Sequence, residues 1–297
     1  MGEVFELSPH FSARIGNPPA TFDGALERLG LSGTHFAGRA KLGGLDVFVK
    51  YRTIRPASRM RIFTRRFVEG FAAPRVIEYR NLRALENRGV AVVPPVLAAS
   101  TSRLGLVRRE LLVSAWLEDS PDVAALAADS ESGRLESELA GAVGRAVARM
   151  HGAGFRHRDL FLRNLVATRL DVDEDPADGG YRISLLDCHK GSFRHRPLRG
   201  VAYDLACLDL DASTLLDHGS RVELLEACLA AAETYGGPAE LERLLERVER
   251  ARRGLALRIH RRKRPGHRKG RLPALDPVPL STLLSARRTS VEDLEFS

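Results

Sequence analysis

The sequence has few of the features that mark a secreted, disulfide-bonded or membrane-spanning chain. Its three cysteines, Cys188, Cys207 and Cys228, lack the paired spacing of a disulfide framework or a zinc site. The longest apolar run, residues 89–99, falls far short of the roughly 20 residues that a bilayer span requires, and it contains two prolines. The N-terminal residues show neither the basic nor the apolar region of a secretory signal. We therefore expect a protein of a reducing cytosol.

The composition excludes a wholly disordered, collagen-like or coiled-coil chain. Hydrophobic residues make up 44% and charged residues 28% of the chain, close to the averages of globular proteins. With 297 residues, the chain is long enough for one large domain or for two lobes around a cleft.

The positive net charge is a local feature near the C-terminus. The whole chain carries a formal charge of +8, but residues 250–272 hold eleven Lys or Arg and no acidic residue. Outside that stretch, 35 basic residues face 38 acidic ones, a net charge of −3. Any binding to an anionic partner is therefore expected from this segment first.

The first part of the chain reads as strands with one main helix. Residues 36–51 predict two strands around Gly43-Gly44, a dipeptide that accepts the backbone of a tight turn. Residues 75–88 have helical spacing, and Gly89 is suited to end that helix. The apolar runs 90–99 and 109–117 read as further strands. The acidic segment 118–122 then indicates a connector between lobes.

The rest of the chain is mostly helical in pattern. Apolar residues recur every three or four positions up to His151, and residues 164–168 and 181–186 predict a hairpin with a long tip. Helices resume from Asp204, and Pro238 opens another helix with one apolar stripe. The pattern predicts an α+β protein with domains at 1–117, 118–272 and a C-terminal tail at 273–297.

The most informative string is His157-Arg158-Asp159-Leu160-Phe161-Leu162-Arg163-Asn164. It matches the H-R-D-L-x-x-x-N catalytic loop of protein kinases at every fixed position. In that chemistry an Asp accepts the proton of the attacking hydroxyl, and an Asn five residues later holds a metal ion near the phosphates. Asp159 and Asn164 are therefore the candidates for catalytic base and metal ligand.

Three further residues follow the order that a kinase requires. Asp187 ends the strand-like segment ISLLD, where a carboxylate suits Mg²⁺, and Lys50 ends the strand-like segment VFVK. A phosphate-binding lysine needs an acidic partner on the next helix, for which Glu78 is the best placed and Glu69 and Glu86 are the competing choices.

Residues from about 40 to 215 resemble the heptose and 3-deoxy-octulosonic acid (Kdo) kinases of the lipopolysaccharide core, which share the two-lobed protein-kinase-like fold. The resemblance rests on VFVKYR, RPASRMRIFTRRF, EYRNLRALENRGVAVVPPV, HRDLFLRN, ISLLD and RGVAYDLACLDL. It implies an ATP- and Mg²⁺-dependent kinase in which Lys50 and Glu78 form the ion pair of the nucleotide-binding lobe. It implies further that Asp159 is the base and that Asn164 and Asp187 bind metal. Asp204 would brace the catalytic loop, or else cap a helix that starts at the next residue.

The chain departs from ordinary protein kinases in several places. It has no G-x-G-x-x-G, and residues 33–38 are the nearest candidate for the loop that covers the phosphates. Cys188 and His189 replace the Phe and Gly of D-F-G, and no A-P-E segment follows. The short segment after Asp187 favours a small hydroxyl acceptor over a protein substrate.

The basic segment has several interpretations. It could grip phosphates of an anionic glycolipid or the inner-membrane surface, where each basic residue contributes roughly 1 kcal/mol, or it could be a solvated tail. A nucleic-acid partner is not supported, because the segment has no aromatic residues for stacking. Trp116 either borders the adenine pocket or is an ordinary core residue. The basic residues considered for contact with the inner-membrane surface are Arg258, Arg261, Arg262, Lys263 and Arg264.

These motifs and the resemblance thus favour a kinase that phosphorylates a sugar hydroxyl, of heptose or Kdo, in the lipopolysaccharide inner core. Such an enzyme is expected in the cytoplasm or peripherally on the inner face of the inner membrane. The alternatives are a kinase of another small molecule or of a protein, and a pseudokinase that binds without transferring phosphate. The sequence does not indicate an oligomeric state.

Overall fold

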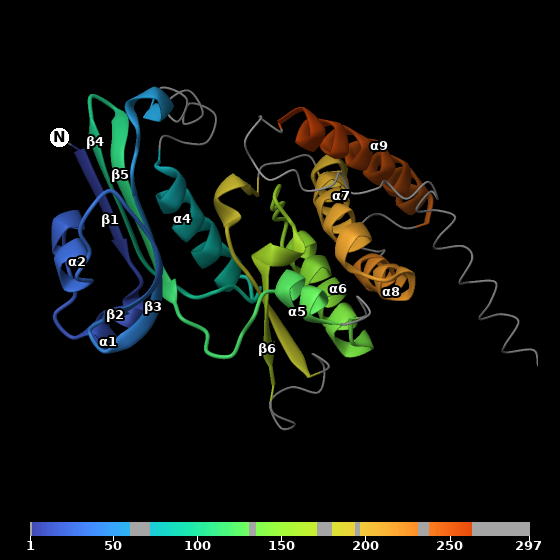
Figure 1. Cartoon of the computed structure of the whole chain (residues 1–297), viewed down its shortest axis with the longest axis horizontal. Coiled ribbons are helices and arrows are strands. Elements are labelled where there is room, and N and C mark those ends of the chain that lie inside the picture. The colour runs from blue at the N-terminus through green and yellow to red at the C-terminus, as the bar shows by residue number, and fades with distance from the viewer. Residues whose placement is uncertain are drawn as a thin grey trace, which may run out of the picture. The chain divides into compact units, whose positions relative to one another are not determined.

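The computed structural model describes residues 2–59, 72–130, 135–170, 180–193, 197–230 and 238–262. The chain forms two compact units (Figure 1). Unit 1 comprises residues 1–118 together with 186–190, and unit 2 comprises residues 119–185 and 191–297. The predicted division into domains 1–117 and 118–272 and a tail at 273–297 stays a prediction. The tail lies outside the described residues.

Unit 1 is built on a five-stranded antiparallel sheet in the order β1-β4-β5-β3-β2. The predicted hairpin at Gly43-Gly44 is confirmed, and both glycines have positive φ, which a tight turn between adjacent strands requires. The strands are β1 (Gly2–Leu7), β2 (His35–Leu42), β3 (Leu45–Thr53), β4 (Pro95–Arg103) and β5 (Leu106–Ala115).

Helices cover both faces of this sheet. The short helices α1 (Pro9–Ile15) and α2 (Phe22–Arg28), which the sequence did not indicate, pack with alternate residues of β3 and β5 in one apolar cluster. The predicted helix α4 (Pro74–Glu86) is confirmed, and its residues Val76 and Tyr79 pack against the other face, which includes Leu112. Because Lys50 lies directly opposite Leu112 in the sheet, Lys50 faces α4.

Unit 2 consists mainly of helices, with a two-stranded hairpin beside α5 (Val123–Asp129) and α6 (Ser137–Gly152) (Figure 1). The predicted hairpin is confirmed as β6 (Leu165–Arg169) paired with β7 (Tyr181–Leu185), and most of its tip lies outside the described residues. The helices that follow are α7 (Pro197–Leu215), α8 (His218–Leu229) and α9 (Pro238–Arg262).

Two boundaries differ from the sequence prediction. The strand expected from residue 90 begins only at Pro95, the second of two adjacent prolines, which cannot donate to a strand ladder. Helix α7 begins seven residues before Asp204, so that Asp204 lies inside the helix. The α+β class is confirmed, and over the described residues no helix is both long and apolar enough to cross a bilayer.

Candidate active site

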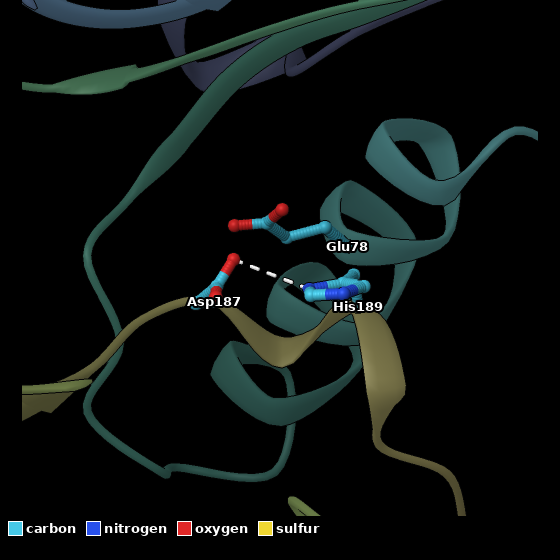
Figure 2. Close-up of side chains that lie close together, drawn as sticks. All are labelled: Glu78, Asp187 and His189. Atoms are coloured by element: carbon cyan, nitrogen blue, oxygen red, sulfur yellow. Dashed lines mark hydrogen bonds and ion pairs between the residues drawn. The ribbon is translucent and has the colours of Figure 1, made fainter. Parts of the chain in front are cut away.

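Three charged side chains from separate segments meet in unit 1. The Nζ of Lys50, on β3, lies 3.0 Å from Oε1 of Glu78, on α4. The same Nζ lies 3.3 Å from Oδ1 of Asp187. Asp187 directly precedes the short helix η3 (Cys188–Lys190), whose first carbonyl accepts a 2.9 Å hydrogen bond from Asn81 on α4. Figure 2 shows Glu78 and Asp187 with their carboxylates side by side.

The cluster settles which acidic residue accompanies Lys50. Glu78 is 1% exposed and makes the ion pair, whereas Glu86 pairs with Arg83 one turn away on the same helix. Glu69, the other competitor, lies outside the described residues. A nearly buried carboxylate is costly unless it is paired, so Glu78 and Lys50 hold each other in place.

A second cation in the cluster, Arg75, was not identified from the sequence. Its Nη1 contacts Glu78 and lies 3.3 Å from Oδ1 of Asp187, and its backbone N–H donates to the buried Glu110. Burial by itself would lower the pKa of Arg75, but the surrounding carboxylates of Glu78, Glu110 and Asp187 raise it. The position of Arg75 three residues before Glu78 on a helix is the one signal that could have found it.

Asp187 is held as an ionised carboxylate. Burial would raise its pKa, but a 3.2 Å hydrogen bond from Nδ1 of His189 and the charges of Lys50 and Arg75 lower this pKa far below its ordinary value. Its backbone has a φ of 57°, a left-handed conformation that non-glycine residues adopt at a cost and that is concentrated at functional sites. Its ion pairs and hydrogen bonds with described side chains all reach Oδ1.

Glu78, Asp187 and His189 lie close enough together to surround a divalent cation, although both carboxylate oxygens of Glu78 are already paired with Lys50 and Arg75. One ligand atom each from Glu78, Asp187 and His189 lies within 4.8 Å of the others (Figure 2). The contacts on Oδ1 of Asp187 leave Oδ2 as a hard oxygen ligand of the kind that Mg²⁺ prefers.

The predicted catalytic loop, residues 157–164, lies in unit 2, with Asp159 near its start and Asn164 at its end. Nδ2 of Asn164 donates a 2.7 Å hydrogen bond to the backbone carbonyl of Asp159, so the amide oxygen of Asn164 stays available as a ligand. Asn164 ends the short helix η1 (Leu162–Asn164). Arg158 has a φ of 63°, so the backbone before Asp159 is also in the left-handed region.

Asp204 holds the start of this loop from inside α7. Its carboxylate accepts backbone N–H bonds from His157 at 2.8 Å and from Arg158 at 2.6 Å. It also accepts a 3.2 Å hydrogen bond from Nε2 of the buried His151 on α6. The alternative interpretation, a helix N-cap at Asp204, is wrong because α7 starts earlier.

A second carboxylate on α7, Asp211, holds the other end of the loop. It lies two helical turns after Asp204 and accepts the backbone N–H of Leu162 at 3.1 Å, and its Oδ2 lies 3.8 Å from Nη1 of Arg163. Burial raises the pKa of Asp211, and Arg163 partly offsets this. No local pattern in the sequence indicates this contact, because it depends on how α7 packs against the loop.

The buried His151 predicts a pH dependence of stability. Burial lowers the pKa of His151 below its usual 6.5, and Asp204 only partly opposes this. The unfolded chain therefore binds a proton more readily than the folded one below about pH 6.5, and stability falls as the pH decreases from there. Urea unfolding between pH 5 and 8 should show the loss, at up to about 1.4 kcal/mol per pH unit from this group.

Two variants isolate the contribution of His151. His151→Gln should be less stable than the wild type at pH 7.5 but should lose less stability on acidification. His35→Gln, which changes an exposed histidine on β2, should keep the wild-type pH profile. Parallel profiles of the wild type and the His151 variant would contradict the prediction.

The remaining predicted features have mixed outcomes. Residues 33–38 lead into the edge strand β2, and the phosphate-covering role suggested for them stays a prediction. Trp116 stacks on Phe48, with ring centroids 6.3 Å apart, and the guanidinium of Arg39 lies 5.2 Å from the Trp116 ring centroid.

The basic segment is described only in part. Helix α9 extends to Arg262 and the side chain of Arg258 is described, whereas Lys263 and Arg264 lie outside the described residues.

Comparison with known proteins identifies the family. The family model described as the lipopolysaccharide kinase (Kdo/WaaP) family matches residues 57–223, more than half of the chain. The chain belongs to this family. The resemblance to the heptose and Kdo kinases is thereby confirmed, and the matched span includes Glu78, the catalytic loop and Asp187.

Individual relatives are more distant. The lipopolysaccharide core heptose(I) kinase WaaP of Pseudomonas aeruginosa is 28% identical over 140 residues, 46% of this chain and 51% of that protein. The chain thus spans about half the length of this curated relative. A solved structure of WaaP in complex with acyl carrier protein is 21% identical, with a TM-score of 0.54, and the match covers 84% of this chain and 99% of that one. The likeness shows the fold, and the predicted protein-kinase-like class is confirmed.

Proposed function

We propose that this protein transfers the γ-phosphoryl group of ATP to a sugar hydroxyl, of heptose or Kdo, in the lipopolysaccharide inner core. Membership of a lipopolysaccharide kinase family supports the reaction class. The observation that carries the proposal is the meeting of Lys50, Glu78 and Asp187 from three distant segments in one ion-paired cluster. That arrangement is the one a nucleotide-binding kinase lobe requires.

In unit 1, we assign the phosphate contacts to Lys50, whose ammonium would hold the α- and β-phosphates of ATP. Glu78 keeps this ammonium in place through the 3.0 Å ion pair. Asp187 is the metal ligand of this unit, since its low pKa keeps it ionised and its Oδ2 can bind a hard cation. Bound Mg²⁺ supplies charge neutralisation on the transferring phosphoryl group.

In unit 2, we assign the acceptor chemistry to the catalytic loop. Asp159 orients the attacking sugar hydroxyl and accepts its proton, and Asn164 offers its amide oxygen as a second metal ligand. Asp204 and Asp211 fix the loop backbone on either side of Asp159, which limits the reorganisation needed to reach the transition state.

A transfer assay tests the proposal. The purified protein is incubated with γ-labelled ATP, Mg²⁺ and deacylated core oligosaccharide, and the product is analysed by mass spectrometry. We expect one added phosphate on heptose or Kdo, and the fragment mass identifies which sugar carries it. Metal-dependent ATP binding in a thermal-shift titration without transfer to any acceptor would favour the pseudokinase alternative. Transfer only to a non-saccharide acceptor would replace the proposed substrate.

The cellular setting follows from the acceptor. Because the inner core is built on a membrane glycolipid, we propose that the protein works at the cytoplasmic face of the inner membrane, bound peripherally. The structure of WaaP with acyl carrier protein makes an acyl carrier protein a second partner to test. Co-purification of a carrier protein from the native host, identified by mass, is the expected result.

A further inference from the structure

Helix α9 brings the start of the basic segment onto α7, the helix that holds the catalytic loop. The guanidinium carbon of Arg258 lies 5.5 Å from the ring centroid of Tyr203 on α7. Tyr203 is the residue before Asp204, which binds the backbone N–H groups of His157 and Arg158. α7 and α9 lie side by side in Figure 1. Arg258 thus contacts the residue that directly precedes Asp204, the side chain that holds the catalytic loop.

The charges around Tyr203 are those of the catalytic loop itself. Burial raises the pKa of the Tyr203 phenol, and the charged groups that act on it include Arg258, Asp159 and Arg158. The proposed base and Arg258 therefore both lie close enough to Tyr203 to act on its phenol. Arg258 and the catalytic loop therefore share Tyr203 as a neighbour.

The positive charge near Tyr203 is not neutralised within the described part of the chain. Arg158, Arg199 and Arg258 are all exposed, and none of them forms an ion pair with a described carboxylate. Arg199 lies one helical turn before Tyr203 on α7, so the two share a helix face. The Nε of Arg258 donates a hydrogen bond to the backbone carbonyl of Gly254. Among the described groups, neither Nη atom of Arg258 makes a hydrogen bond.

We propose that Arg258 and Tyr203 bind an anionic group, a carboxylate or a phosphate, on the acceptor saccharide. The inference rests on the proposed function and names how that acceptor is recognised. The planar guanidinium can donate two parallel hydrogen bonds to a carboxylate or phosphate, and the tyrosine ring beneath it fixes its plane. Kdo carries a carboxylate, and an anionic group bound here would hold the sugar beside the loop of Asp159.

This assignment differs from the membrane interpretation of the basic segment. A membrane-binding arginine gains from charge density alone and needs no fixed neighbour. Arg258 instead contacts a defined ring, that of Tyr203, on the same helix as Asp204, which holds the catalytic loop. The two interpretations therefore make different predictions for a soluble acceptor.

Steady-state kinetics of Arg258→Gln test the site, with deacylated core oligosaccharide as a soluble acceptor. We expect the KM for the acceptor to rise about tenfold or more, the loss typical of one charge-assisted hydrogen-bonded contact. The KM for ATP should stay unchanged and kcat should change little. Arg253→Gln, which removes an exposed arginine on another face of α9, should behave as the wild type.

A neutral acceptor separates recognition from a structural effect. With carboxyl-reduced, dephosphorylated oligosaccharide, the wild type and Arg258→Gln should have the same acceptor KM. If Arg258→Gln raises the acceptor KM equally for neutral and anionic oligosaccharides, or raises it for neither, the proposal is overturned. If Arg258→Gln changes only the binding to vesicles of anionic phospholipid, the membrane interpretation replaces it.

Direct binding keeps this test independent of catalysis. Titration calorimetry of the full chain with the anionic oligosaccharide should show weaker binding for Arg258→Gln than for Arg253→Gln. If the wild type transfers no phosphate yet binds the oligosaccharide through Arg258, the proposed function fails and the site stands. If transfer occurs and both variants bind equally, the site fails and the function stands.

Discussion

Replacing Asp159 by alanine is expected to lower the rate of phosphoryl transfer by about a thousandfold while ATP binding is retained. A positioned general base contributes on the order of 10²- to 10⁴-fold, and the carboxylate of Asp159 is the group assigned to accept the proton of the sugar hydroxyl. The residues assigned to ATP in unit 1 are untouched by this change. Single-turnover measurements of transfer, together with calorimetric titration of ATP, provide the two readouts.

The matched control is Asp129→Ala, which removes an exposed carboxylate at the end of α5 in the same unit. It should transfer phosphate at the wild-type rate. Thermal unfolding of both variants checks that each is folded. A normal transfer rate in Asp159→Ala would refute its assignment as the base, whereas loss of both transfer and ATP binding would indicate a wider defect.

The largest effect on stability is expected from Asp209→Ala. Asp209 is fully buried on α7 and pairs with two buried arginines, Arg221 on α8 at 2.7 Å and Arg252 on α9 at 3.1 Å. Removing the carboxylate leaves two guanidinium groups without their shared anion in the interior of unit 2. Arg252 keeps a 3.5 Å contact with Glu249, but removing one partner of a buried ion pair still destabilises a protein by about 3–5 kcal/mol. Urea unfolding of the variant and the wild type measures the difference.

A surface ion pair on α9 provides the comparison. Glu240 and Arg243 are one turn apart, and Arg243 is exposed while Glu240 is half-buried, so Glu240→Ala should cost about 1 kcal/mol or less. Asp209→Asn, which keeps an acceptor oxygen but loses the charge, should fall between the two. A cost for Asp209→Ala as small as that for Glu240→Ala would show that the three helices do not depend on this ion cluster.

Elements with strong local signals were predicted correctly from the sequence. The hairpin at Gly43-Gly44 is specified by two glycines that adopt the positive φ angles of a tight turn without strain. Helix α4 is specified by its apolar spacing and by the glycine that follows it, Gly89. The β6–β7 hairpin and α9 likewise carry their own periodicity and turn residues. In each case the partners that form the element lie within 20 residues of one another along the chain.

Elements that depend on distant partners were missed. Strand β1 joins the sheet by pairing with β4, about 95 residues later in the chain. Helices α1 and α2 are only seven residues long each and are stabilised by the sheet they cover. Arg75 and Asp211 escaped notice for the same reason, because an arginine or an aspartate on a helix surface has no distinguishing local pattern.

The sequence by itself determined the spacing of Asp159 and Asn164, the residues to which we assign catalysis and metal binding, because a short loop joins them and the spacing does not depend on the rest of the chain. Tertiary structure alone decided which glutamate accompanies Lys50 and which carboxylates of α7 hold the catalytic loop. The physical reason is that a buried charge must find its partner across the fold, and packing, not spacing along the chain, brings those partners together.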